Sequence, residues 1–205
     1  GGGKDVLDGG AGSDTAVYVG ATGVVVDLAR AARNTGDAAS DKLISIENVI
    51  GSAGNDTLRG TAYDNRLVGS LGDDVLEGDW GVDLLEGGAG DDVLRGGAGS
   101  DRLFGGDGAD RIVVDFGQDR VHGGGGEDDF LFYGGQMTIA DFADNVDDLV
   151  IYRTAIGDAD LTKAEIFDSA KVVGSDLLLY LTPSKLIRLE GLTDLAMLAD
   201  DLFLA

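Results

Sequence analysis

The chain has 205 residues, of which 38 are acidic and 15 basic, and its formal net charge is −23 at pH 7. Phosphate backbones and anionic membrane surfaces repel a polyanion of this density, so nucleic acid is excluded as a partner, and no apolar run reaches the ~20 residues that would span a membrane. Such an acidic excess is typical of disordered chains, yet 43% of the residues are apolar, so these must be placed regularly and a divalent cation must neutralise the carboxylates on folding.

The chain opens on Gly1–Lys4, without the apolar segment of a cleaved signal peptide and without an initiating methionine. We therefore expect a piece of a longer protein whose export does not use a cleaved leader within this chain. Two nine-residue units follow, with Asp5 and Asp14 nine positions apart and an apolar residue, Leu7 or Ala16, two positions after each.

Residues 1–50 form the first predicted region. Its two strand-like runs are GVVVDLA at 23–29 and KLISIENVIG at 42–51, and the polar, alanine-rich residues 30–41 between them are expected to form a loop. The strands would extend the repeat array that follows. An independent module is the alternative, although some fifty residues hardly bury a core of their own.

The second region, residues 51–131, consists of nine consecutive nonapeptides. They read GSAGNDTLR, GTAYDNRLV, GSLGDDVLE, GDWGVDLLE, GGAGDDVLR, GGAGSDRLF, GGDGADRIV, VDFGQDRVH and GGGGEDDFL. Their sixth positions are Asp56, Asn65, Asp74, Asp83, Asp92, Asp101, Asp110, Asp119 and Asp128. Their eighth positions are all apolar, namely Leu58, Leu67, Leu76, Leu85, Leu94, Leu103, Ile112, Val121 and Phe130. An unbroken period of this kind indicates a repeat architecture.

The period of nine residues predicts the fold of this region. Three residues around the apolar eighth position form a short strand with one inward side chain, and the six glycine-rich residues before them form a turn. Two units complete one coil, so residues 18 apart stack as parallel strands and the eighth positions form two facing ladders. The result is an all-β fold, a thin parallel roll whose stability accumulates by stacking.

The turns place the sixth positions in two rows along the edges of the roll. One row holds Asp56, Asp74, Asp92, Asp110 and Asp128, and the other holds Asn65, Asp83, Asp101 and Asp119. Neighbours in a row lie about 4.8 Å apart, so their carboxylates repel one another unless a cation lies between successive turns. Loop carbonyls can complete the oxygen shell of calcium, whereas magnesium demands a tighter octahedron. The two rows contain four and three gaps, which predicts up to seven calcium ions.

The nonapeptides resemble the GGxGxDxUx repeat of the RTX (repeats-in-toxin, haemolysin-type) family. The resemblance implies a right-handed parallel β-roll, a calcium-binding β-solenoid, in which turns 18 residues apart share each ion through two sixth-position carboxylates and loop carbonyls. It implies that the best sites lie between Asp74 and Asp92, Asp92 and Asp110, and Asp83 and Asp101.

The residues that the resemblance implies around several calcium ions contribute a carboxylate or a loop backbone. They are Asp5, Asp14, Ser52, Gly54, Asp56, Gly69, Leu71, Gly72, Asp74, Gly78, Trp80, Gly81, Asp83, Gly87, Gly88, Ala89, Gly90, Asp92, Gly96, Gly97, Ala98, Gly99, Asp101, Gly105, Gly106, Asp107, Gly108, Asp110, Asp119, Gly123, Gly125 and Asp128. Asn65 and Tyr63 depart from the pattern and predict a weak or empty site toward Asp83. The repeat that begins at Val114 lacks both leading glycines, which makes its calcium doubtful.

Residues 132–205 form the third region, a β-rich cap. Strands are expected within 138–152, 176–181 and 185–191, with a hairpin turn at Pro183 and Ser184. Thr193 is expected to cap a short terminal helix. The phrase DFADNVDDLVI at 141–151 and the ending Asp200–Leu204 resemble the C-terminal targeting region of type I secretion substrates. A plain capping helix is the alternative for the chain end, and both roles can coexist.

The sequence does not indicate an enzyme. With His122 as its single histidine and no cysteine, the usual zinc sites and nucleophile systems lack parts, and His122 is expected to be an ordinary surface residue near a turn. The predicted function is a secreted, extracellular calcium module that folds outside the cell and supports type I secretion of a larger protein, with the secretion machinery as a partner. The alternative is a module that binds an extracellular polysaccharide or cell surface, with the exposed loop residue Trp80 in contact with glycan.

Overall fold

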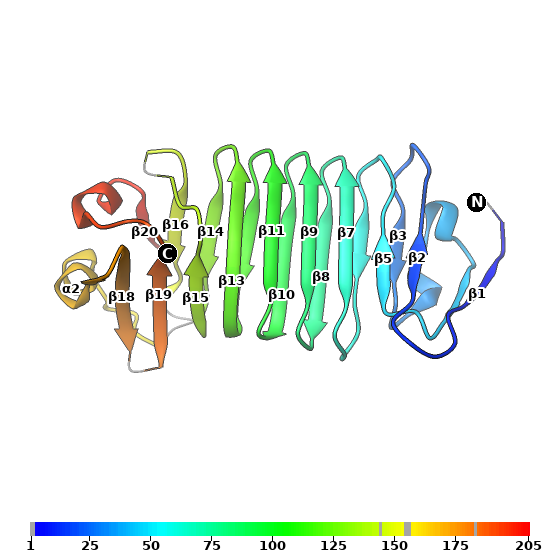
Figure 1. Ribbon diagram of the computed structural model, residues 1–205, viewed down its shortest axis with the longest axis horizontal. Helices are drawn as coiled ribbons and strands as arrows, with labels where there is room; N and C mark the ends of the chain where they lie inside the picture. Colours follow the sequence, from blue (N-terminus) through cyan, green and yellow to red (C-terminus); the bar gives the residue numbers. More distant parts are fainter. Residues whose placement is uncertain (1–2, 144, 154–156, 183) are drawn as a thin grey trace.

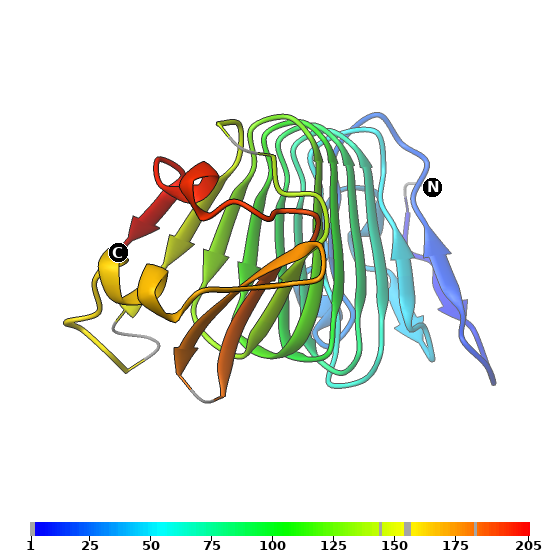
Figure 2. The same ribbon diagram turned by 60° about the vertical axis from the view of Figure 1, so that its left-hand side comes forward.

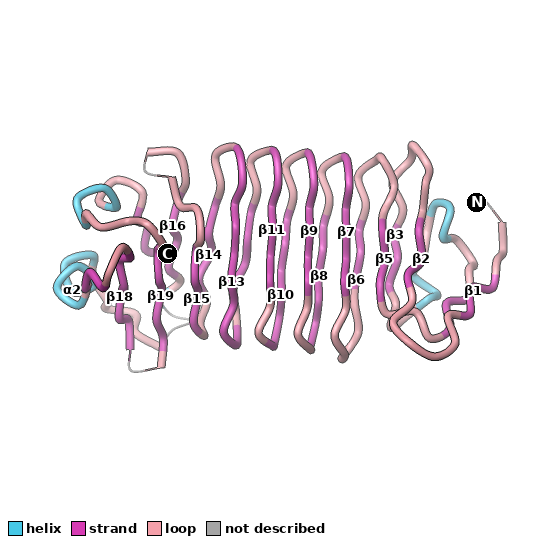
Figure 3. The backbone as a smooth tube through the Cα atoms, in the orientation of Figure 1, coloured by secondary structure: helices cyan, strands magenta, loops and turns pink. Residues whose placement is uncertain are grey.

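A computed structural model describes residues 3–143, 145–153, 157–182 and 184–205. The chain coils into a parallel β-solenoid in which strands from alternate half-turns form two ladders, with additional strands at the C-terminal end (Figure 1). The parallel roll with a β-rich cap that the sequence predicts is therefore confirmed. Turns run along both edges of the solenoid (Figure 3), which is where the nonapeptide period places them.

Each ladder pairs every second strand of the chain. The first ladder runs through β2 (Thr15–Val17), β5 (Asn48–Ile50), β7 (Arg66–Leu71), β9 (Leu84–Ala89), β11 (Arg102–Asp107), β13 (Phe116–Gly125), β15 (Gln136–Ile139) and β19 (Lys185–Leu189). The second runs through β3 (Val25–Asp27), β6 (Thr57–Arg59), β8 (Val75–Trp80), β10 (Val93–Gly99), β12 (Arg111–Val114), β14 (Asp129–Phe132), β16 (Asp148–Ile151) and β20 (Leu202–Leu204).

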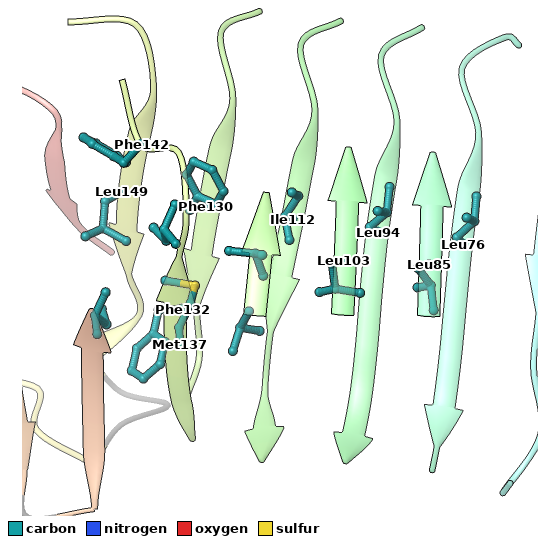
Figure 4. Close-up of a cluster of buried hydrophobic side chains, with 14 of the residues drawn as sticks. Leu76, Leu85, Leu94, Leu103, Ile112, Phe130, Phe132, Met137, Phe142 and Leu149 are labelled. Atoms are coloured by element: carbon teal, nitrogen blue, oxygen red, sulfur yellow. The ribbon is translucent and has the colours of Figure 1, made fainter. Parts of the chain in front are cut away.

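The core is a thin double row of side chains between the ladders. Within the repeats the register is 18 residues, as in Leu76 beside Leu94 and Leu85 beside Leu103. Figure 4 shows these residues and Ile112 pointing between the two layers of strands. All nine eighth-position side chains are fully buried, because only this position of each strand faces inward.

The N-terminal region joins the same ladders. β3 pairs with β6 and β5 with β7, so these segments extend the roll as three-residue strands. β1 (Val6–Asp8) pairs with β4 (Lys42–Ile44) beyond them. Residues 30–41 include two single-turn 3-10 helices, Ala31–Arg33 and Gly36–Ala38.

The C-terminal cap differs from expectation in two places. Residues 138–152 hold parts of two separate strands, β15 and β16, because the segment between them turns at the edge of the roll. A helix that the sequence reading missed, α2 (Lys163–Ser169), is capped by reciprocal hydrogen bonds between Thr162 and Glu165. The T-x-x-E spacing of a capping box was the available signal.

β17 (Lys171–Val173) and β18 (Asp176–Thr182) add to β19 in antiparallel fashion, and Figure 2 shows the hairpin of β18 and β19 in orange at this end. The predicted hairpin turn at Pro183 and Ser184 falls partly outside the described residues, since Pro183 is not among them.

The end of the chain corrects two predictions. Asp194, rather than Thr193, caps the 3-10 helix Leu195–Leu198 by accepting a hydrogen bond from the Ala196 amide. The closing residues form strand β20 beside β16, so the terminal helix is followed by a strand that completes the second ladder. Among the described residues, no helix is both long and apolar enough to cross a bilayer.

Candidate metal centre

The sixth-position residues lie in two rows, one along each edge of the solenoid. In both rows the backbone amide of one sixth residue donates a hydrogen bond to Oδ1 of the sixth residue one turn later, at 2.6–3.0 Å. This ladder confirms that residues 18 apart are direct neighbours along each edge, and it uses one oxygen of every carboxylate.

The second carboxylate oxygen has no such partner. Oδ2 is buried and accepts no hydrogen bond in Asp74, Asp83, Asp92, Asp101 and Asp110. Buried polar atoms in folded proteins nearly always have a partner, and an unpaired carboxylate oxygen is costly. Five equivalent orphaned oxygens in two rows therefore point to a cation as the missing partner.

The electrostatics of the rows agree with this. Burial raises the pKa of Asp74, Asp83 and Asp119 to about 7. It raises the pKa of Asp92 and Asp110 to about 6, and backbone hydrogen bonds offset only part of the effect. Desolvation penalises the charged form and the neighbouring carboxylates add repulsion. A bound cation reverses both effects.

The first glycine of each repeat lies directly against this oxygen. A Cβ at Gly87 would be 2.2 Å from Oδ2 of Asp92 and 2.6 Å from the carbonyl oxygen of Gly105, one turn further on. The carboxylate and this carbonyl therefore face the same small space, which only glycine leaves open. Calcium binds oxygens at about 2.3–2.6 Å and takes six to eight of them, so the donor set fits calcium.

The third-position residues contribute through their backbone. The carbonyls of Ala89, Ala98 and Asp107 accept hydrogen bonds of 2.8–3.0 Å from fourth-position glycine amides one turn earlier. Each carbonyl oxygen keeps a second lone pair. Gly90, at a fourth position, has φ +129°, a conformation that redirects the loop backbone and that other residues rarely adopt.

The two rows weaken at their N-terminal ends. Asp56 is saturated, because Ser52 donates both its amide and its hydroxyl to the carboxylate and the Val24 amide donates to Oδ1. Asn65 is also occupied: its side-chain oxygen accepts from Thr61 and its Nδ2 donates to the Glu47 carbonyl at 2.6 Å. Hydrogen bonds thus replace the cation partner at both positions.

The degenerate repeat at Val114 keeps its register. Asp119 accepts the Asp101 amide at 2.9 Å like its counterparts. A Cβ at Gly117 would be 1.4 Å from the Gly99 carbonyl oxygen, so the retained fourth glycine is a steric requirement of the stacking. The loss of the two leading glycines therefore leaves the row intact.

The opening units lie at the N-terminal edge. The Asp14 amide donates to Glu47 at 2.9 Å and the Asp5 amide donates to Asp41 at 2.9 Å. Because β2 pairs with β5 in a register of 33 residues, Asp14 faces a glutamate rather than an aspartate 18 positions later. These two aspartates are separate from the five orphaned oxygens.

The sequence reading missed acidic residues that continue the edges into the cap. Asp147 accepts the Asp128 amide at 3.2 Å and Asp201 accepts the Asn145 amide at 2.9 Å. Asp141 accepts the amides of Gly123 and Gly124, both at 3.0 Å. Asp147 stands two residues before the buried Leu149, the same spacing as in the repeats, and this was the available signal.

Two residues singled out for other roles are also placed. His122 lies within β13, stacked on Phe104 with ring centroids 4.9 Å apart, so it is a half-buried strand residue rather than a turn residue. Trp80 is 67% exposed, as expected. Among the described residues, no three histidine, cysteine or acidic side chains converge as a side-chain metal site, so backbone oxygens must supply much of any calcium shell.

Comparison with known proteins identifies the repeats. The chain matches the RTX calcium-binding nonapeptide repeat in four copies, at residues 1–16, 50–85, 77–112 and 104–136, together about half of its length. No curated protein matches it.

Two solved structures are similar to the chain. Extracellular lipase LipA from Serratia marcescens is 19% identical with a TM-score of 0.39, over 77% of this chain and 40% of the lipase. The AlgE6R3 subunit of the Azotobacter vinelandii mannuronan C5-epimerase is 24% identical with a TM-score of 0.29, over 75% of this chain and 80% of that subunit. The chain therefore spans less than half of the lipase. On its repeats, the chain belongs to the RTX calcium-binding nonapeptide repeat family.

Proposed function

We propose that this RTX module is a calcium-gated folding device of an exported protein: the chain stays unfolded where calcium is scarce and folds when it meets extracellular calcium. The observation that carries the proposal is the set of five buried Oδ2 atoms without a partner, arranged in two rows. A folded chain without cations would leave every one of them unsatisfied.

The energetics favour gating over mere decoration by calcium. The chain carries a formal charge of −23 and 35 glycines, so self-repulsion and backbone entropy both oppose folding. The core is only two side chains thick and gives limited compensation. When cations bind the rows, their binding free energy becomes folding free energy, as in other metal-folded domains.

Five gaps have a carboxylate on both sides and an orphaned oxygen on at least one. In one row they lie between Asp74 and Asp92, Asp92 and Asp110, and Asp110 and Asp128. In the other row they lie between Asp83 and Asp101, and Asp101 and Asp119. These gaps are the proposed calcium sites, and the saturated Asp56 and Asn65 ends are proposed to bind calcium weakly or not at all.

The biological setting follows from the family. RTX repeats are typical of extracellular proteins exported by type I secretion. An unfolded polyanion can thread through an exporter channel, and folding on the far side prevents its return. We propose that the module is non-catalytic, serves a larger exported protein, and offers Asp200–Leu204 to the exporter.

Limited proteolysis of the full chain tests the gating. At submicromolar free calcium, a broad-specificity protease should cleave throughout 51–131. At roughly millimolar calcium, the level of weak extracellular modules, this region should be protected as one block. Equal protection of 51–131 at both calcium levels would refute the gating.

A further inference from the structure

A hollow of about 230 Å³ lies on the outer face of the second ladder, away from the edges that carry the aspartate rows. Its floor is formed by Gly97 and Ala98 of β10. Its two walls are Trp80, at the end of β8, and Phe116, at the start of β13. The hollow is therefore built by three successive turns of the solenoid.

The repeat register explains the shape. Ala98 pairs with Trp80 on one side and with Phe116 on the other, so a small residue lies between two aromatic ones at equivalent positions. With a strand spacing of about 4.8 Å, the backbones of the two aromatic residues lie about 9.6 Å apart. Both side chains remain largely in solvent, 67% and 69% exposed. Large aromatic side chains left exposed around a concave surface are typical of ligand sites.

Charged side chains with planar hydrogen-bonding groups line the hollow. Arg59 contacts Glu77 at 2.6 Å and Asp79 at 3.3 Å. Arg95 contacts Oδ2 of Asp115 through both Nε and Nη2 at 2.6 Å. These pairs fix the orientation of donors and acceptors around the aromatic walls.

A second hollow of about 130 Å³ adjoins the first and shares Arg59 and Glu77 with it. Its lining includes Asp27, which is 3% exposed and whose carboxylate oxygens accept no hydrogen bond within the described chain. Arg33 approaches this carboxylate at 3.6 Å. The two hollows form a groove along the solenoid axis that presents an unfilled acceptor.

The backbone at the groove carries strain. Asp79 has φ +76°, whereas the equivalent residue one turn later is Gly97, with φ +99°. A non-glycine residue in this conformation costs about 1 kcal/mol or more and persists where the surroundings require it. The carboxylate gained at this position contacts Arg59 on the rim of the groove.

We propose that this groove binds a segment of a neutral polysaccharide, with one pyranose ring between Trp80 and Phe116 and its hydroxyls on the charged rim. A pyranose has apolar C–H faces that suit aromatic walls, and vicinal hydroxyls that suit paired guanidinium and carboxylate groups. The first hollow is smaller than the roughly 300–1,000 Å³ of pockets for drug-sized ligands, so it holds a single ring, and the adjoining hollow gives the polymer room to continue.

Charge decides the class of glycan. The groove lining brings as many acidic as basic side chains or more, and the whole chain is strongly anionic. A polyuronate or a nucleic acid would be repelled. Unpaired Asp27 oxygens need a donor such as a hydroxyl, which a neutral sugar supplies and a carboxylate does not.

Tryptophan fluorescence gives a direct readout, because Trp80 is the single tryptophan of the chain. The calcium-loaded full chain is titrated with neutral hexasaccharides built of glucose, mannose or galactose units, and in parallel with uronic acid hexasaccharides, an aromatic peptide and a mononucleotide. At least one neutral hexasaccharide should shift the emission saturably. No shift with any neutral sugar, or a tighter response to an anionic probe or the peptide, overturns the proposal.

Variants locate the binding. Phe116→Ala should weaken the neutral-sugar affinity by about tenfold, the scale of one aromatic contact, and retains Trp80 as the reporter. Ala98→Leu fills the floor and should abolish the response. Tyr63→Ala, which removes another exposed aromatic ring outside the groove, is the matched control.

Calcium-dependent circular dichroism is recorded for each variant, so a folding defect is separated from a binding defect. Unchanged affinity in folded Phe116→Ala and Ala98→Leu chains would show that the sugar binds elsewhere, which contradicts the proposal whether or not calcium gates folding.

Discussion

The amide of Asp74 donates a hydrogen bond to Oδ1 of Asp92, one turn later, at 2.7 Å, while Oδ2 of the same Asp92 is buried without a partner. Each carboxylate in the interior of a row thus has one oxygen committed to the backbone ladder and one available to a cation. Oδ1 supports the stacking of turns, and Oδ2 makes the stacking dependent on metal.

This arrangement predicts unequal effects along one row. Asp92→Ala removes a ligand from two successive gaps and leaves the Asp74 amide without its acceptor, so the calcium midpoint for folding should rise by about tenfold, equivalent to about 1.4 kcal/mol. Asp56→Ala, at the saturated end of the row, should shift the midpoint much less. Calcium titrations followed by circular dichroism compare the two, and equal shifts would disprove shared ligation.

Acid should partly replace calcium. The pKa of Asp74, Asp83 and Asp119 is about 7 in the fold and about 3.9 in an unfolded chain, so these groups take up protons on folding. Metal-free stability should therefore be lowest above pH 7 and should rise as the pH falls from about 7 toward 4. Circular dichroism in chelator between pH 8 and pH 5 checks this, and a fold that weakens on acidification in that window would contradict it.

The same protons compete with calcium. Because the carboxylates must be deprotonated to bind the ion, the calcium midpoint should be higher at pH 6 than at pH 8. Titrations at the two pH values, with ionic strength held constant, should show this order. A midpoint independent of pH would mean that the buried carboxylates are not the ligands.

Space beside the carboxylate is a separate requirement. Gly87→Ala would place a Cβ 2.2 Å from Oδ2 of Asp92, so calcium should no longer fold the chain normally, and the calcium midpoint should rise or the transition should disappear. Gly20→Ala, whose Cβ would be 3.3 Å from the exposed Asp37 side chain, is the control outside the nonapeptides. Similar calcium titrations for both variants would contradict the tight approach of glycine to the carboxylate.

The closing strand should be structural whatever its role in export. Leu202 is fully buried beside Leu149, whereas its neighbour Phe203 is 44% exposed. Leu202→Ala should lower the free energy of unfolding by about 2–5 kcal/mol at saturating calcium, as for other buried leucines. Phe203→Ala should have a much smaller effect. Urea denaturation measures both, and equal losses would mean that β20 does not close the second ladder.

The extent of the fold that sequence reasoning predicts follows from where the period holds. Between Leu58 and Phe130 every strand repeats at a fixed spacing, so the register and the inward positions follow from one unit. In the cap, β15 pairs with β19 at a separation of 50 residues and β16 with β20 at 53. Such long-range pairs leave no local signal, and the strands between them could be paired in several ways.

The site shows the same division. The two aspartate rows follow from the period, but the saturation of Asp56 depends on the rotamer that brings the Ser52 hydroxyl within 2.8 Å of the carboxylate. Asp147 takes up the row in a register of 19 rather than 18, because the turn after β15 is irregular. Spacing alone does not reveal either contact.

Circular dichroism and light scattering of the full chain, first in excess chelator and then during addition of calcium, test the central claim most directly. The predicted result is an expanded, disordered chain in chelator that becomes compact and β-rich in one cooperative step at roughly millimolar calcium, with magnesium unable to replace calcium fully. A compact, β-rich chain that persists in excess chelator, or full folding with magnesium alone, would contradict calcium-gated folding.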